Sequence, residues 1–378
     1  MINTNVTATI LSQTIPAQAK VRPESAPATV PHVPAIDPQV DISEALADDI
    51  QKRQLKQSEL LSQNLLGART AAARLAATLN DPAAEPTAKT RVAQALAEQI
   101  ATGKFSGQLT RNAVESGLAF LSVRGQELTP ENREQLARDL APLLVKQLGN
   151  ALSGSGIESP IGMRSSFDDI LDGLQDLIGI IKEDYLDVYA RMVEAYAELF
   201  RELNEDVIGE LQKWLTVVGD KGAVQIDAKA IREALDELIS KYSLPNPDAV
   251  LFPVPGEDGS VTGTSMEDAL KWLTAMGLPA SCLKQLPDGS FCIVMDLSPL
   301  TEMKAGLPSG DKPELLPARF QAWQAAWNAQ IQELESALQK HTQKYSNANS
   351  IHDNVQKVIS STLSALFEML KSFAASLG

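Results

Sequence analysis

Residues that build catalytic, metal and disulfide-linked sites are scarce in this sequence. It contains two cysteines, Cys282 and Cys292, and three histidines, His32, His341 and His352. No Cys-x-x-Cys or His-Glu-x-x-His occurs, so no metal site is predicted, and two cysteines cannot build a disulfide framework. No carboxylate stands alone in an apolar segment, as a tuned acid–base pair would. We therefore expect no catalytic residues, no cofactor-binding residues and no enzymatic activity.

Long apolar segments are also missing. No run of about 18 apolar residues occurs, so we expect no helix that spans a bilayer. The first residues lack the basic and apolar regions of a Sec signal peptide. We expect a chain that is soluble when made. If it leaves the cell, we expect it to leave by a route that reads a polar, unstructured N-terminus.

Positive charge is in deficit. The 33 Lys and Arg residues are outnumbered by 48 Asp and Glu, which gives a net charge of −15. Nucleic acid and anionic membrane surfaces attract basic proteins, so neither is expected as a partner. The simplest consequence of this charge is solubility. Aromatic residues make up only 5% of the chain, and the abundance of Ala, Leu, Gln and Glu favours helix over sheet.

The first 164 residues divide by composition into three parts. Residues 1–40 carry repeated prolines in a polar run, which predicts a disordered region suited to an export signal. Residues 41–150 predict an N-terminal helical hairpin or small bundle, because apolar residues recur at helical spacing. Residues 151–164 are rich in glycine and predict a linker. The helices expected in the second part run from Asp41 or Ser43 to Leu79, from about Thr87 to Ile100, and from Pro130 to Leu148.

Two long segments carry a heptad seam, the alternation of apolar residues at spacings of three and four that is typical of coiled coils. In the first, residues 165–217, the seam slips after Leu199. In the second, residues 313–378, it continues from Phe320 to Phe373, roughly 80 Å of helix. No globular core would bury such a rod, so we predict that the two segments pair as an antiparallel intramolecular coiled coil. Between Asp168 and Lys213 the charge is −9, which predicts an acidic outer face.

The seam of the second segment includes polar positions. Its members are Phe320, Gln324, Trp327, Ile331, Leu334, Leu338, His341, Tyr345, Ala348, His352, Val355, Ile359, Thr362, Leu366, Met369 and Phe373. Two histidines eleven residues apart suggest polar positions that fix the register of the coiled coil. A role in sensing pH is the alternative.

Residues 218–312 differ in character, because prolines and glycines interrupt the helical pattern. We predict a strand at Ala223–Ile226 and helices at 228–242 and 265–276. Asp288-Gly289 predicts a two-residue hairpin turn, which places Cys292 opposite Gln285 and leaves both cysteines unbonded. The fold class is therefore mainly α: a long antiparallel coiled coil, an N-terminal helical hairpin and an inserted small mixed α/β domain.

Several separate motifs occur in residues 165–378, at 184–189, 250–253, 278–284, 294–300, 319–324, 339–350 and 353–361. Together they resemble the needle-tip proteins of type III secretion systems, the IpaD/SipD/BipD family, and the middle ones look most like the SipD branch. They occur in the family's order. Residues 1–160 match no motif, and there the resemblance supplies only an architectural analogy.

The resemblance implies a needle-tip protein that is exported through the type III system and caps the needle at the bacterial surface as a small ring, expected to be a pentamer. It implies control of effector secretion, a platform for translocator proteins and contact with the needle subunit. The N-terminal hairpin would act as a self-chaperone before export from the cytoplasm. Some family members bind bile salts such as deoxycholate as an environmental cue.

Polar residues on the C-terminal rod are the expected contacts for the needle or another partner. They are Tyr345, Asn347, Asn349, Asp353, Asn354 and Lys357. All but Tyr345 lie off the seam or beside it, where polar side chains are expected to be free. Two alternatives belong to the same machinery: a membrane-active translocator, which the missing apolar span disfavours, and a secreted effector enzyme, which the missing catalytic residues disfavour.

Overall fold

The computed structural model describes residues 38–181, 185–219, 222–256 and 258–377. Most of the predicted disordered region, residues 1–40, lies outside the described residues, although helix α1 already begins at Pro38. Contacts within the chain separate Met1–Ile42 from Ser43–Gly378. All contacts described below lie within the second unit.

Three helices precede the rod: α1 (Pro38–Leu79), α2 (Pro86–Gly125) and α3 (Pro130–Ala151). Thr129 caps α3 because its side chain accepts a hydrogen bond from the backbone N–H of Asn132. The prediction for α2 is too short, since the helix continues well past Ile100. Small residues such as Gly107 and Thr110 are buried in the added part, where they allow close packing but weaken the apolar pattern.

The first rod segment is a series of helices rather than one. It consists of α4 (Phe167–Ile181), α5 (Asp187–Glu202), the π-helical turn η2 (Leu203–Ile208) and α6 (Leu211–Trp214). The predicted continuous helix over 165–217 is wrong at its end, because Leu215 begins strand β1 (Leu215–Val218). The π turn explains the slip of the seam after Leu199, since a wider turn shifts every following side chain around the helix axis.

The described residues between 215 and 315 form two small antiparallel sheets and three helices, so the first and last strands extend beyond the bounds 218–312 of the mixed α/β domain. One sheet has the order β1-β2-β6 and the other β3-β5-β4. The new strands are β2 (Ala223–Ile226), β3 (Val250–Phe252), β4 (Leu283–Gln285), β5 (Phe291–Val294) and β6 (Glu314–Leu315). The helices are α7 (Ala228–Lys241), α8 (Met266–Met276) and α9 (Ser298–Ala305), with 3₁₀ turns η3 (Pro247–Ala249) and η4 (Ala280–Cys282).

The hairpin between β4 and β5 has a different register from the predicted one. Cys292 lies opposite Lys284, not Gln285. The backbone N–H of Leu286 donates to Ser290 O at 2.8 Å, and Gly289 has a φ of 89°. The loop therefore has three residues, with a left-handed glycine that forms a bulge, instead of a two-residue turn. Both cysteines remain free and buried, as expected.

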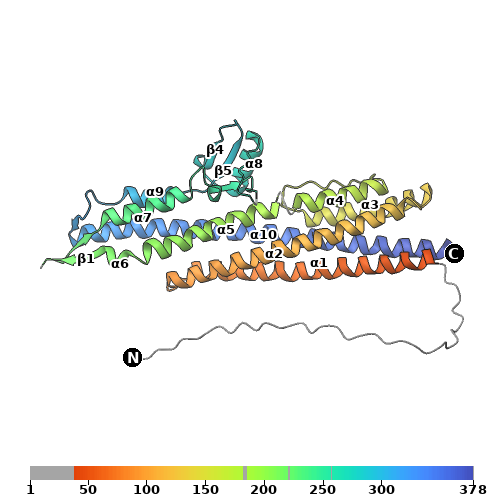
Figure 1. Ribbon diagram of the computed structural model, residues 1–378, viewed down its shortest axis with the longest axis horizontal. Coiled ribbons are helices and arrows are strands. Elements are labelled where there is room, and N and C mark those ends of the chain that lie inside the picture. The colour runs from red at the N-terminus through yellow and green to blue at the C-terminus, as the bar shows by residue number, and fades with distance from the viewer. Residues whose placement is uncertain (1–37, 182–184, 220–221, 257, 378) are drawn as a thin grey trace, which may run out of the picture. The chain divides into compact units, whose positions relative to one another are not determined.

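The C-terminal rod is one helix, α10 (Pro317–Leu377), of 61 residues and about 90 Å. Figure 1 shows it running beside α5, with which it packs. The predicted seam is buried at most positions, but Gln324 is exposed and Trp323 is buried instead. The predicted fold class is confirmed. In the parts of the chain that the structure describes, no helix is long and apolar enough to cross a membrane.

Candidate functional site

The C-terminal half of α10 is buried on two faces. Before Gln339 the buried positions are Trp323 and members of the seam, whereas further along the helix a second set of positions beside the seam is buried as well. We call this second set the polar row; it consists of Thr342, Asn349, Asp353, Gln356 and Ser360. Helix α1 covers it, because Ser58 Oγ accepts a hydrogen bond from Ser360 Oγ at 2.6 Å and Ser62 contacts Asp353.

Asp353 is the centre of the contact between α1 and α10. Its carboxylate accepts a hydrogen bond from Ser62 Oγ at 2.7 Å, and it pairs with Arg69 Nη2 at 3.3 Å and Lys357 Nζ at 2.8 Å. The Asp353 side chain is only 3% exposed, whereas that of Lys357 is 59% exposed. Arg69 Nη1 also donates to Ser350 Oγ at 3.3 Å. A buried carboxylate is thus satisfied by donors from both helices, as a buried charge requires.

Other polar atoms in the same contact have no hydrogen-bond partner in the described structure. Both amide atoms of Gln54, the Oε1 of Gln57 and the Nε of Arg69 are buried without one on α1. Opposite them, Asn349 Oδ1 and Gln356 Nε2 are in the same condition on α10. An unpaired buried polar group costs about 1–3 kcal/mol. The α1–α10 contact therefore combines satisfied pairs, at Asp353 and between Ser58 and Ser360, with buried amide and guanidinium atoms that have no partner.

The residues predicted as contacts fall into two groups. Asn347, Asn354 and Lys357 are exposed. The expectation of free side chains is wrong for Asn349 and Asp353, which are 0% and 2% exposed beneath α1. Long-range packing of α1 decides this, and the spacing on α10 alone does not show it. The available signal was on α1, where Gln54 and Ser58 interrupt the apolar face at helical spacing.

Tyr345 lies on the seam and is 2% exposed. Its hydroxyl accepts a hydrogen bond from Asn349 Nδ2 at 3.2 Å, and burial raises its pKa. Tyr345 therefore links the seam to the polar row through a buried hydrogen bond. The exposed residues Asn347, Asn354 and Lys357 lie beside the polar row at the surface.

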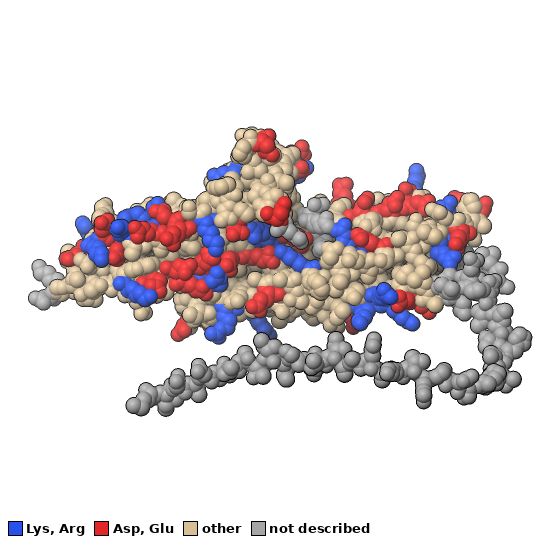
Figure 2. Space-filling model, in the orientation of Figure 1, with Lys and Arg blue, Asp and Glu red and all other residues tan. Residues whose placement is uncertain are grey.

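Opposite charges hold the N-terminal helices on the rod. Lys104 of α2 pairs with Glu194 of α5, and Lys89 of α2 pairs with Glu335 of α10, each at 2.7 Å. Residues 1–150 contain equal numbers of acidic and basic side chains, so the whole net charge of −15 lies in residues 151–378. Figure 2 shows acidic side chains gathered over α5, α6 and α7, with basic ones among them. The hairpin thus supplies cations to an acidic rod.

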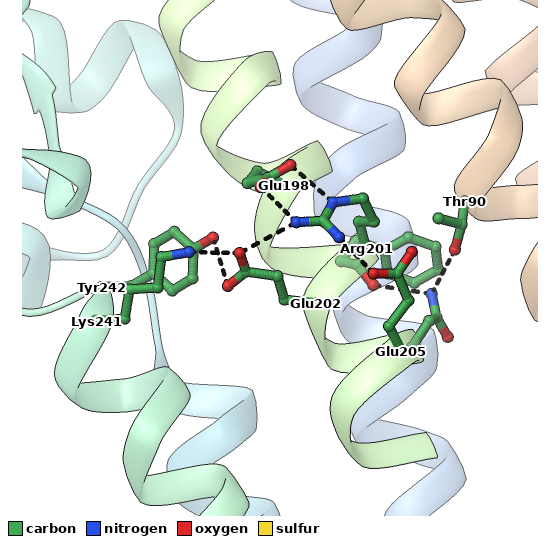
Figure 3. Close-up of polar contacts among 9 residues, drawn as sticks. Thr90, Glu198, Arg201, Glu202, Glu205, Lys241 and Tyr242 are labelled. Atoms are coloured by element: carbon green, nitrogen blue, oxygen red, sulfur yellow. Dashed lines mark hydrogen bonds and ion pairs between the residues drawn. The ribbon is translucent and has the colours of Figure 1, made fainter. Parts of the chain in front are cut away.

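A polar cluster fixes the π turn to its neighbours (Figure 3). Arg201 pairs with Glu198 at 2.6 Å and with Glu202 at 3.2 Å, and its hydrogen bonds hold the pKa of the Glu198 carboxyl below its usual value. Lys241 and Tyr242, at the end of α7, both contact Glu202. No group of His, Cys, Asp and Glu side chains suited to a metal ion occurs within the described ranges. We interpret the cluster as a structural contact that connects α5 and the π turn with α7.

An aromatic pocket of about 260 Å³ lies where the rod meets the mixed domain. Tyr185, which lies just before α5, Tyr189 of α5 and Trp272 of α8 line it, together with Lys271 and Ile157. The ring centroids of Tyr189 and Trp272 are 5.7 Å apart in an edge-on arrangement. Burial raises the pKa of Tyr189 to about 12, so its hydroxyl is neutral. The pocket offers aromatic faces beside one cationic side chain.

Comparisons with known proteins agree on one family. A model of type III secretion systems tip complex components matches residues 24–374. The chain is 33% identical to the cell invasion protein SipD of Salmonella typhi over 270 residues, 70% of this chain and 76% of the relative. It is 33% identical to the invasin IpaD of Shigella flexneri over 200 residues, 52% of this chain and 57% of that protein.

The chain is also similar to two solved structures. A pathogenicity island 1 effector protein from Chromobacterium violaceum is 29% identical, with a TM-score of 0.48 over 87% of this chain and 99% of the other. BipD of Burkholderia pseudomallei is 20% identical, with a TM-score of 0.49 over 82% of this chain and 98% of its own.

Proposed function

The chain belongs to the family of type III secretion system tip complex components, and we propose that it caps the secretion needle as a ring, expected to be a pentamer. In this role it restrains effector secretion until host contact and provides the platform on which translocator proteins assemble. The observation that carries the proposal is the polar row of α10 beneath α1. This surface is suited to a helical partner, and helix α1, which covers it, leaves buried polar atoms in the contact without hydrogen bonds.

The chemistry of the two faces of α10 indicates which partner leaves. Separating the seam from α4 and α5 would expose a continuous apolar surface to water, at about 25 cal/mol per Å². Exposing the polar row instead hydrates the buried amides of Gln54, Asn349 and Gln356 that lack partners. We infer that α1 is a self-chaperone that covers the polar row until assembly, when the needle subunit takes its place.

The predicted contact residues are then expected to act at different stages of assembly on the needle. Asn347, Asn354 and Lys357 are exposed while α1 is in place, so they are available for a first encounter with the needle. Asn349 and Asp353 become available only after α1 has left. Tyr345 keeps the seam in register and positions Asn349 through their hydrogen bond.

A reversible staple tests this proposal. Ser58 and Ser360 have their hydroxyl oxygens 2.6 Å apart, which makes Ser58→Cys with Ser360→Cys a suitable pair for a disulfide between α1 and α10. We expect the oxidised protein not to occupy the tips of isolated needles, and reduction to restore occupancy. Each single cysteine variant is the matched control and should occupy tips under both conditions. Normal tip occupancy by the fully oxidised protein would contradict the release of α1.

We further propose that the aromatic pocket binds a bile salt such as deoxycholate. One face of a steroid nucleus suits the rings of Tyr185, Tyr189 and Trp272, and the carboxylate suits Lys271 at the rim. Titration of deoxycholate against tryptophan fluorescence should show saturable binding that Trp272→Ala removes and Lys271→Ala weakens. Lys229→Ala, an exposed lysine on α7, is the matched control. Binding that survives Trp272→Ala at full affinity would place the ligand elsewhere.

A further inference from the structure

A histidine is buried in the layer where the rod meets the mixed domain. His341 of α10 is 4% exposed, and neither Nδ1 nor Nε2 has a hydrogen-bond partner among the residues that the structure describes. Its ring packs against that of Tyr196 on α5, with centroids 4.4 Å apart. Since the imidazole makes no polar contact there, a role in fixing register through hydrogen bonding does not explain it.

Tyr196 connects this layer to the mixed domain. Its hydroxyl accepts a hydrogen bond from the backbone N–H of Asp296 at 2.9 Å. The Asp296 carboxylate accepts hydrogen bonds from the N–H and hydroxyl of Ser298, at 3.0 and 2.7 Å, where α9 begins. His341, Tyr196 and Asp296 therefore form a continuous path from the seam of the rod to the start of α9.

The charged groups around His341 oppose a second positive charge. Burial is the main cause that lowers the pKa of His341, to about 4, and Lys344 and Lys340 on the same helix lower it further. Asp296 acts in the opposite direction but less strongly. From α5 the neighbour is Tyr196, which in turn lies near Cys282 of the η4 turn. Burial raises the pKa of both groups, so both are neutral.

We propose that His341 is an acid-sensitive latch, whose protonation opens the junction between the rod and the mixed domain while the rest of the chain stays folded. A proton on the imidazole places a charge in an apolar layer beside two lysines, and opening the junction hydrates it. The nearest compensating anion is Asp296, whose carboxylate would leave the start of α9 to reach the imidazolium. This regulation by acid goes beyond needle capping and does not depend on it.

The two cysteines report on the opening without any added probe. Cys282, 2% exposed, belongs to the large core that contains Tyr196 and the seam of the rod. Cys292, 0% exposed, belongs to a separate small cluster with Val250 and Val294 inside the mixed domain. Opening of the junction uncovers Cys282 and leaves Cys292 covered, whereas global unfolding uncovers both.

The test is thiol labelling of the full chain with a pyridyl disulfide, which reacts in acid, followed by peptide mapping. Rates are measured between pH 7 and pH 3.5 and divided by those of an unfolded peptide at the same pH. An opening linked to one proton should raise the Cys282 rate about tenfold per pH unit between about pH 6.5 and 4. The Cys292 rate should stay constant over this range.

Two variants test whether His341 is the group that binds the proton. His341→Phe keeps an aromatic ring against Tyr196 and should abolish the rise at Cys282. His352→Phe, another buried histidine of α10 about 16 Å along the helix, is the matched control and should retain the rise. Equal labelling of both cysteines, a flat Cys282 rate, or a rise that persists in His341→Phe would each overturn the proposal. The comparison of the two thiols in the unsubstituted chain stands even if a variant fails to fold.

Discussion

Between Tyr345 and Leu366, α10 presents its seam, which is apolar except at Tyr345, His352 and Thr362, to α3, α4 and α5, and it presents the polar row to α1. On the seam, Ala348, Val355 and Ile359 are 0–1% exposed and bring no polar atom that needs a partner. On the polar row, Asp353 is fully satisfied but Asn349 and Gln356 each retain an unpaired atom. Both faces are equally buried, so burial alone does not distinguish them.

The difference between the two faces lies in what each would lose on separation. Apolar surface gains nothing from water, so the seam is suited to a permanent contact. Amides, hydroxyls and a carboxylate regain hydrogen bonds in water, so the polar row is suited to a contact that one helix can take over from another. Four predictions test this contrast, in descending order of expected effect.

The largest effect is expected from the seam. Leu338 is 0% exposed, and Leu338→Ala should lower the free energy of unfolding by about 4 kcal/mol because it removes buried methyl groups and leaves a cavity. Urea unfolding followed by circular dichroism measures this. Gln324→Ala, at a seam position that is exposed, should change stability by less than about 0.5 kcal/mol. Similar losses for the two variants would mean that the seam is not the permanent contact.

The seam should also weaken in acid, through His341. Its pKa is lowered from 6.5 to about 4 in the folded chain, so between these values only the unfolded chain binds the proton. Stability is therefore complete above about pH 6.5 and falls as the pH drops, by a total of about 3 kcal/mol at pH 4. Below pH 4 this loss stops growing. Urea unfolding of the wild type and of His341→Phe at pH 6.5 and pH 4 isolates the contribution of His341 to the pH dependence of stability. An equal loss of stability in both proteins between these pH values would contradict this contribution.

On the polar row, Asp353→Ala should cost about 2 kcal/mol. The change leaves Arg69 without its carboxylate partner, and the cost is moderate because the Arg69 side chain is already 29% exposed. Hydrogen exchange should accelerate in α1 and stay unchanged in α5, since only the replaceable contact is weakened. Lys357→Ala, which removes the exposed partner of the same carboxylate, is the control and should change exchange little. Equal acceleration in both helices would mean that α1 and α5 leave together.

The seam could be read from the sequence because its cause is local. The alternation from Trp327 to Leu366 follows from the helix period, and both the helix and its burial are confirmed. Helix starts at Pro130 and Ser265 could also be predicted, since capping depends on neighbours in sequence. The register of the β4–β5 hairpin could not, because a two-residue and a three-residue loop around Asp288-Gly289 differ only in backbone conformation.

The polar row could be located but not interpreted from the sequence. The sequence predicts Asn349 and Asp353 as polar positions beside an apolar seam, which is correct. Their burial depends on Ser62 and Arg69, nearly 300 residues earlier in the chain. A row of polar residues on a helix indicates a solvent-exposed face unless the polar residues that pack against it from a distant helix are known. The unpaired amides carry no sequence signal, since pairing depends on side-chain geometry.

The smallest effect has the opposite sign. Gln54 of α1 is 0% exposed and both of its amide atoms lack partners in the described contact, so Gln54→Leu should raise the free energy of unfolding by about 1 kcal/mol. Hydrogen exchange in α1 should slow by roughly fivefold. Gln63→Leu, an exposed glutamine on the same helix, is the matched control and should leave exchange unchanged. A variant that tightens α1 should also occupy needle tips less well, because it makes the contact between α1 and α10 more apolar, like the permanent contact of the seam. Destabilisation by Gln54→Leu would instead show that this amide stabilises the docked hairpin. The difference between the seam and the polar row would then rest on Asp353 alone.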